Sequence, residues 1–71
     1  MPTTAERPRS LRDDEVALLT LLAAGLPLDS VARRLAVSER TLRRRIRTIC
    51  ELLGVPSAIT AVAWAARRGL V

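Results

Sequence analysis

The 71-residue sequence has no His, Tyr or Phe, and it contains one Cys and one Trp. The absence of His removes the commonest general base and excludes Ser–His and Cys–His nucleophile pairs. One Cys without His cannot build a zinc site from the usual ligands, and it offers no disulfide within the chain. We therefore predict that the protein is not an enzyme and that it holds no metal and no other cofactor.

The sequence also has no apolar run close to the roughly 20 residues that a membrane-spanning helix needs. Its first ten residues, MPTTAERPRS, lack the apolar segment of a secretory signal. These absences predict a cytoplasmic protein that does not bind membranes, with Cys50 as a reduced thiol in the core. A basic helix lying on an anionic membrane is a weak alternative, because the apolar face of that helix is needed for the core.

Positive charge is abundant and concentrated. All 12 basic residues are Arg, and with 7 acidic residues they give a net charge of +5. Residues 33–47 hold seven of these Arg and one acidic residue, Glu39, so this stretch carries +6 and the rest of the chain −1. A basic patch confined to one short stretch indicates a polyanionic partner, and nucleic acid is the usual one.

Helical periodicity is strong throughout and strand signals are weak. Apolar residues make up 49% of the chain, which is enough for one small core. We expect an all-α, four-helix domain over residues 10–71, preceded by a flexible N-terminal tail over residues 1–9. The predicted helices cover residues 12–24, 28–35, 39–53 and 58–68.

Capping residues support these boundaries. Ser38 and Ser57 precede the third and fourth helices as N-caps. Gly25, Gly54 and Gly69 follow the first, third and fourth helices, where a left-handed residue commonly ends a helix.

The third helix has two chemically distinct faces. Leu42, Ile46, Ile49 and Leu53 fall on one side, whereas Arg40, Arg44, Arg47 and Glu51 lie near the opposite pole. The short break before this helix is typical of a helix-turn-helix, in which the second helix of the pair enters the DNA major groove. Arg suits this role because its planar fork pairs with guanine O6 and N7.

The fourth helix is harder to orient. Ile59, Val62, Ala63 and Ala66 form an apolar stripe that we expect to face the core. Ala61 and Trp64 would then be exposed, and an exposed Trp beside a small residue suggests a contact surface. The alternative is that Trp64 lies across a neighbouring helix of its own domain.

Longer stretches resemble the DNA-binding domain of LuxR-type (GerE-type) bacterial transcription regulators. The similar segments are "LLAAGL" at 21–26, "VARRLAVSERTLRRRI" at 31–46, "LLGV" at 52–55 and "AVAWAARRGLV" at 61–71, in the same order and without a gap. The resemblance implies a helix-turn-helix domain of four helices, with the third helix as recognition helix and a homodimer joined through the fourth. The exposed positions Ala61 and Trp64 are then the expected two-fold contact. The resemblance leaves open whether the chain is a stand-alone regulator or the output domain of a longer one.

The resemblance also implies roles for single residues. Arg43, Arg44 and Arg47 match base-reading positions, Ser38 matches the recognition-helix N-cap, and Thr41 matches a phosphate contact with Arg40 beside it. Arg45 replaces a frequent His, and its angle on the helix favours a DNA phosphate contact. Other departures from the family pattern are Arg12-Asp13 for Thr-Pro, Leu28-Asp29 for Asn-Lys and Glu39 for Pro.

The sequence therefore predicts a transcription regulator that binds double-stranded DNA sequence-specifically, with helix 39–53 in the major groove. RNA polymerase is a further candidate partner. The alternative is a protein-interaction module that keeps the helix-turn-helix fold without reading bases and uses Trp64 as its binding hot spot.

Overall fold

The computed structural model describes residues 11–71, and within this range the chain is all-α and has no strand. It contains the four predicted helices, each within one residue of its predicted ends. They are α2 (Asp13–Ala23), α3 (Leu28–Leu35), α4 (Glu39–Leu53) and α5 (Ala58–Arg67). The flexible tail predicted over residues 1–9 lies outside the described residues.

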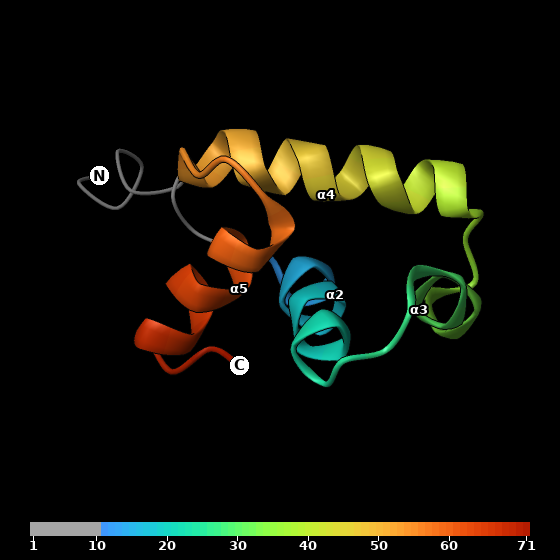
Figure 1. The fold of residues 1–71 in the computed structure, drawn as a ribbon, viewed down its shortest axis with the longest axis horizontal. Helices are drawn as coiled ribbons and strands as arrows, with labels where there is room; N and C mark the ends of the chain where they lie inside the picture. The colour runs from blue at the N-terminus through green and yellow to red at the C-terminus, as the bar shows by residue number, and fades with distance from the viewer. Residues whose placement is uncertain (1–10) are drawn as a thin grey trace.

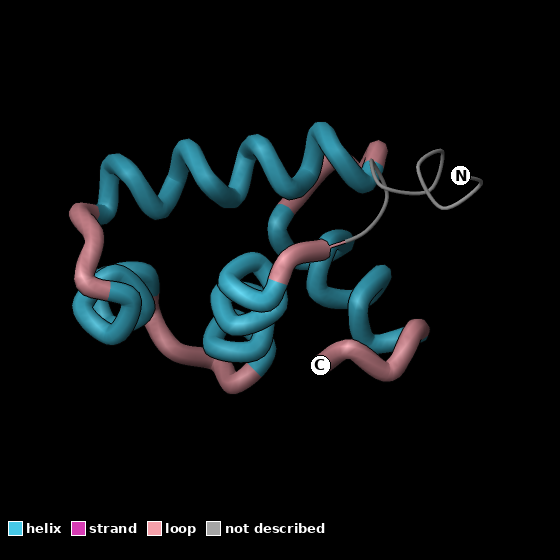
Figure 2. Tube along the Cα trace, turned by 180° about the vertical axis from the view of Figure 1, so that it is seen from behind, coloured by secondary structure: helices cyan, strands magenta, loops and turns pink. Residues whose placement is uncertain are grey.

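The longest helix, α4, lies across one side of the molecule, and the other three helices lie beneath it (Figure 1). It packs against α3 near its first residues and against α5 near its last, while α2 lies between α3 and α5 and contacts both. The reverse view shows the same arrangement and the short connections between successive helices (Figure 2). One long face of α4 is therefore left without a neighbouring helix.

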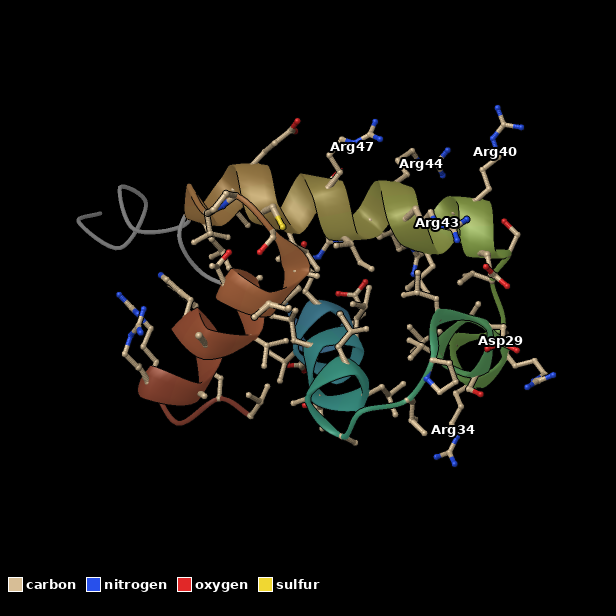
Figure 3. The ribbon with its side chains drawn as sticks, viewed as in Figure 1. Asp29, Arg34, Arg40, Arg43, Arg44 and Arg47 are labelled. Carbon is tan, nitrogen blue, oxygen red and sulfur yellow. The ribbon has the colours of Figure 1, made fainter. Side chains whose placement is uncertain are left out.

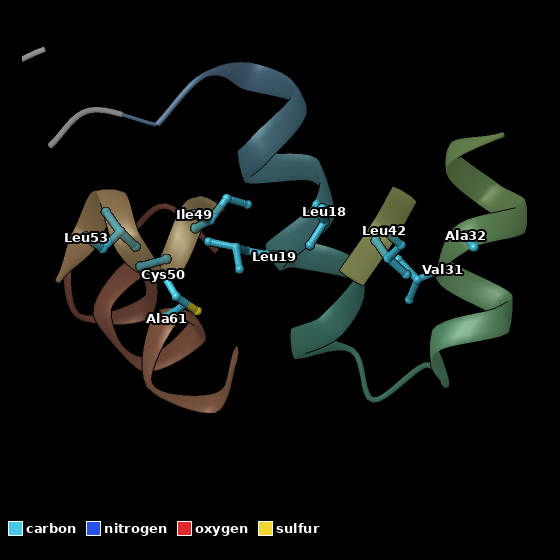
Figure 4. Packing of buried hydrophobic residues seen from close by; sticks show 10 residues of the cluster. Leu18, Leu19, Val31, Ala32, Leu42, Ile49, Cys50, Leu53 and Ala61 are labelled. Atoms are coloured by element: carbon cyan, nitrogen blue, oxygen red, sulfur yellow. The ribbon is translucent and has the colours of Figure 1, made fainter. Parts of the chain in front are cut away.

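A single apolar core holds this arrangement together. Its members come from all four helices, and Figure 4 shows them in two adjoining groups, one between α3 and α4 and one between α4, α2 and α5. The buried residues are Leu18, Leu19, Val31, Ala32, Leu42, Ile49, Cys50, Leu53, Ala61 and Ala65. The inward face predicted for α4 is confirmed at Leu42, Ile49 and Leu53, while Ile46 is half-buried against the core.

The orientation predicted for α5 was wrong. Ala61 and Ala65 are completely buried, whereas Ile59 is 81% exposed. The reason is that α5 is apolar on nearly all sides, so its pattern does not identify the inner face. Small Ala side chains allow this helix to approach its neighbours closely, and the larger Ile is left outside.

Both predicted Ser caps are present. The Ser38 hydroxyl accepts a hydrogen bond from the Thr41 backbone N–H at 3.0 Å, and the Ser57 hydroxyl accepts one from the Thr60 N–H at 3.3 Å. At the start of α2 the carboxylate of Glu15 accepts a bond from the Arg12 backbone N–H at 2.9 Å. This contact satisfies a backbone N–H at the start of the helix that would otherwise lack a partner there.

The helix-turn-helix connection, residues 36–38, begins with a left-handed residue that is not Gly. Ala36 has φ 59° and ψ 41°, and the Val37 N–H donates to the Ala32 carbonyl at 3.0 Å. The end of α4 has the same bonding pattern, with Gly54 at φ 72° and the Val55 N–H bonded to Cys50. In both places the left-handed residue closes the last turn of the helix.

Replacing Ala36 by Gly is expected to stabilise the protein by about 1 kcal/mol. The left-handed conformation is unfavourable for a residue with a Cβ, and Gly adopts it without that cost. Thermal unfolding followed by circular dichroism measures the effect. Ala24→Gly is the matched control, because Ala24 has φ −75° and gains nothing from Gly. Equal behaviour of the two variants would contradict the explanation.

Within residues 11–71, no single helix is long and apolar enough to cross a membrane. Helices α4 and α5 meet the requirements of length and composition only when taken together, as a pair bent by 54°.

Candidate nucleic-acid interface

The uncovered face of α4 carries a row of Arg side chains. Arg40, Arg44 and Arg47 are exposed and extend away from the other three helices (Figure 3). At about 100° per residue the three positions fall within an arc of about 60°, so they form one ridge along the helix. We call these three side chains the Arg ridge. It extends about 10 Å along the 15-residue helix at 1.5 Å per residue.

Arg43 lies at the edge of the Arg ridge and has an acidic partner. Its Nη2 is 3.3 Å from Glu39 Oε1, one helical turn earlier. By contrast, no carboxylate among residues 11–71 lies within ion-pairing distance of Arg40, Arg44 or Arg47. The four Arg side chains line a shared open hollow on the surface. Within residues 11–71 only one of the four, Arg43, has an ion-pair partner, so the hollow strongly attracts anions.

The N-terminus of α4 adds polar groups to the same end of the helix. The Ser38 hydroxyl donates to Thr41 Oγ1 at 3.1 Å in addition to capping the Thr41 N–H. This leaves the Thr41 hydroxyl hydrogen as a free donor, while Ser38 has no further hydroxyl hydrogen to give. The backbone N–H groups of the first helical turn, with the positive end of the helix dipole, also favour an anion here.

Arg45 lies apart from the Arg ridge. Its exposed side chain lines a cleft of about 130 Å³ between α4 and the start of α2. The same cleft is lined by Asp14 and Glu15, although neither carboxylate pairs with Arg45. Arg45 is therefore close to the edge of the outer face, beside two acidic groups that lower the local positive potential.

Helix α3 carries a mixed charge beside the interface. Asp29, the residue that replaces Lys of the resembled family, is 3.9 Å from the Arg33 guanidinium. Arg34 points to the far side of α3 from the Arg ridge (Figure 3). Helix α3 therefore contributes little net positive charge to the face that α4 presents.

The predicted contact surface on α5 has to be corrected. Ala61 is buried, so it cannot contact another molecule. Trp64 is half-buried against the core, and the Arg68 guanidinium carbon lies 4.0 Å from the centre of its ring, a cation–π contact. Trp64 thus lies within its own domain, the alternative that the sequence left open.

A different apolar surface is exposed instead. Ile59 and its neighbours line a shallow hollow between α5 and the end of α2, formed by Leu22, Ala23, Ala58, Ile59 and Val62. Sequence reasoning missed this surface because the apolar stripe of α5 was assigned to the core. A helix that is apolar all round gives no signal for the correct choice.

Cys50 is a core residue, as predicted. It is 8% exposed, and burial together with the nearby Glu51 carboxylate raises the pKa of its thiol. A raised pKa keeps the thiol protonated and weakly nucleophilic. Among residues 11–71 there is no group of three His, Cys, Asp or Glu residues able to hold a metal ion.

The chain is similar to a known regulatory protein. Over 61 residues, or 86% of this chain, the sequence is 38% identical to the transcriptional regulatory protein YdfI of Bacillus subtilis (strain 168). The chain spans 29% of the length of that relative. No protein-family model and no solved structure matches the chain.

Proposed function

We propose that this domain binds double-stranded DNA sequence-specifically as part of a transcription regulator of the LuxR type. The observation that carries the proposal is the Arg ridge on the uncovered face of α4, in a helix whose other face is fixed in the core. The similarity to a transcriptional regulatory protein supports it. A rigid helix about 22 Å long, with charge on its outer face, fits the major groove of B-DNA.

We assign base contacts and phosphate contacts from the position of each residue on α4 and from its ion pairs. Arg44 and Arg47, in the middle of α4 and without an ion pair among residues 11–71, contact base edges. Arg43 joins them when Glu39 releases it. Phosphates are met by the following residues at the edges and N-terminal end of the helix: Ser38, Arg40, Thr41 and Arg45. The Ser38 hydroxyl is occupied by its two bonds to Thr41. Ser38 therefore acts on the DNA backbone by fixing the N-terminus of α4 against a phosphate.

A salt titration tests this function. Duplex affinity, measured by fluorescence anisotropy, is expected to fall linearly on a log–log plot as salt rises, because each neutralised phosphate releases counterions. A random DNA pool should also yield an enriched sequence on selection. An affinity that is independent of salt, or a pool that yields no enrichment despite binding, would overturn the proposal of sequence-specific binding.

Replacing Glu39 by Gln is expected to raise duplex affinity several-fold at low salt. The change frees Arg43 and removes a negative charge beside the DNA, so the slope of log affinity against log salt should steepen by about 1. Stability should fall by less than about 1 kcal/mol, because exposed ion pairs contribute little. Glu51→Gln, the same change at the far end of α4, is the control and should have the smaller effect on affinity.

We also propose that the domain forms a homodimer through α5, using the exposed side of the helix. Ile59 is a large apolar side chain left in solvent, and it lies in an apolar hollow that includes residues of α2. Exposed apolar patches of this kind are typical of protein contacts. A two-fold contact would place two α4 helices on one DNA, so that they address two half-sites about one helical turn apart.

Ile59→Glu is expected to abolish this dimer, because a charge would have to be buried at its centre. Sedimentation measures how many copies of the protein bind a duplex with two half-sites. The unchanged protein should bind as two copies in one step, whereas the Ile59→Glu variant should bind the two half-sites independently. Affinity for a single half-site should not change. Ala17→Glu, on the exposed side of α2, is the control. Unchanged cooperativity in the Ile59 variant would contradict a dimer through this face.

The alternative function, a protein-interaction module that uses Trp64 as its hot spot, receives less support. The Trp64 ring is half-buried and covered on one side by Arg68, so it presents little free apolar surface to a partner.

A further inference from the structure

The outer face of α4 presents few kinds of hydrogen-bonding side chain to a DNA base. Its exposed side chains are Arg40, Arg43, Arg44, Arg45, Arg47, Thr48 and Glu51. The full sequence contains no Asn and no Gln, the two side chains that pair bidentately with adenine. Among these 71 residues adenine therefore has no bidentate side-chain partner.

The remaining polar groups are also restricted. The Thr48 hydroxyl donates to the Arg44 carbonyl at 3.0 Å, so its hydrogen is committed to the helix backbone. The Glu39 carboxylate is occupied by Arg43 at 3.3 Å. A carboxylate can accept from the cytosine N4 or the adenine N6 amino group, so a contact by Glu39 alone would not select a base pair.

Two Arg of the Arg ridge, both near the middle of α4, are available to read bases. Arg44 and Arg47 have no carboxylate partner within residues 11–71, and they are three residues apart on the same side of α4. Their separation along the axis is about 4.5 Å at 1.5 Å per residue. Successive base pairs are about 3.4 Å apart, so the two forks reach neighbouring base pairs.

We propose that the half-site recognised by this domain contains guanines in at least two neighbouring base pairs, read in the major groove by Arg44 and Arg47. This proposal rests on the proposed function and specifies its substrate. Arg–guanine pairing uses both the O6 and N7 acceptors. Discrimination therefore depends on the fork of each guanidinium and not only on its charge.

The test begins with duplexes selected from a random pool by the 71-residue chain. Neighbouring G·C pairs are expected in the enriched window, and an enriched window of A·T pairs alone would overturn the proposal. Replacing the two guanines by 7-deazaguanine removes N7 and should lower affinity about tenfold or more. Replacing them by inosine keeps O6 and N7 and removes only the minor-groove amino group, so affinity should be nearly unchanged.

Charge-conserving variants separate this proposal from DNA binding itself. Arg44→Lys and Arg47→Lys should keep the salt slope while lowering the preference for the selected site about fivefold or more. Arg67→Lys, in α5, is the control. If the preference survives both changes and 7-deazaguanine is tolerated, guanine reading is wrong although DNA binding stands. If no duplex binds at low salt, the proposed function itself fails.

Discussion

Leu42→Ala is expected to destabilise the domain by about 2–5 kcal/mol, the range for removing a buried Leu side chain. Leu42 is completely buried and points toward Val31 of α3 (Figure 4). It is the residue of α4 that most directly joins the two helices of the helix-turn-helix. Small domains have a total stability of about 5–15 kcal/mol, so this one change would remove a large fraction of that stability.

Urea denaturation followed by Trp64 fluorescence and by helical circular dichroism measures this loss. Ile59→Ala removes the same kind of apolar bulk from an exposed position, and at low protein concentration it should change stability by no more than about 0.5 kcal/mol. If the free energy of unfolding fell by a similar amount in both variants, burial of Leu42 would contribute no more to stability than the exposed Ile59. The contact between α3 and α4 would then not be the element that holds the Arg ridge in place.

The helices were predictable because local and global signals agree. In α4 an N-cap Ser, an apolar face with helical spacing and a terminal Gly all specify the same boundaries, and the helix covers residues 39–53 as expected. The outward direction of Arg40, Arg44 and Arg47 follows from the same periodicity. Where one face is apolar and the other charged, burial of the apolar face decides the orientation.

The inner face of α5 could not be predicted in this way. Its sequence, AITAVAWAAR, has apolar residues in nearly every direction, so hydrophobicity does not select a face. The choice is made by the fit of Ala61 and Ala65 against neighbouring helices, which is a property of the packed core. A large residue such as Ile59 is excluded there by its volume.

The pairing within the candidate site was also hidden from sequence reasoning. Base-reading roles were predicted for Arg43, Arg44 and Arg47 together, but among residues 11–71 only Arg43 of the three forms an ion pair, with Glu39. The spacing of Glu39 and Arg43 permits an ion pair, but so does that of Arg47 and Glu51, which do not pair. Rotamers and competing partners decide whether it forms. The pair separates Arg43 from its neighbours chemically and makes Arg44 and Arg47 the more direct candidates for reading bases.

The double change Arg44→Ala and Arg47→Ala is therefore expected to have the largest effect on DNA binding. Each bidentate Arg–base contact contributes about 1–3 kcal/mol of discrimination. Loss of two should reduce affinity for the selected site about 30-fold or more. Binding to unrelated duplexes should fall much less, because phosphate contacts by other residues remain. Both side chains are exposed, so the folded structure should be retained.

Arg67→Ala with Arg68→Ala removes the same charge from the end of α5 and is the matched control. If both double variants lose affinity equally for selected and unrelated duplexes, binding depends on net charge and α4 reads no bases. If the change in α4 leaves the preference for the selected site intact, the reading surface lies elsewhere. A loss of preference confined to the variant in α4 is the result expected from two unpaired guanidinium groups held outward by a helix that is fixed in the core.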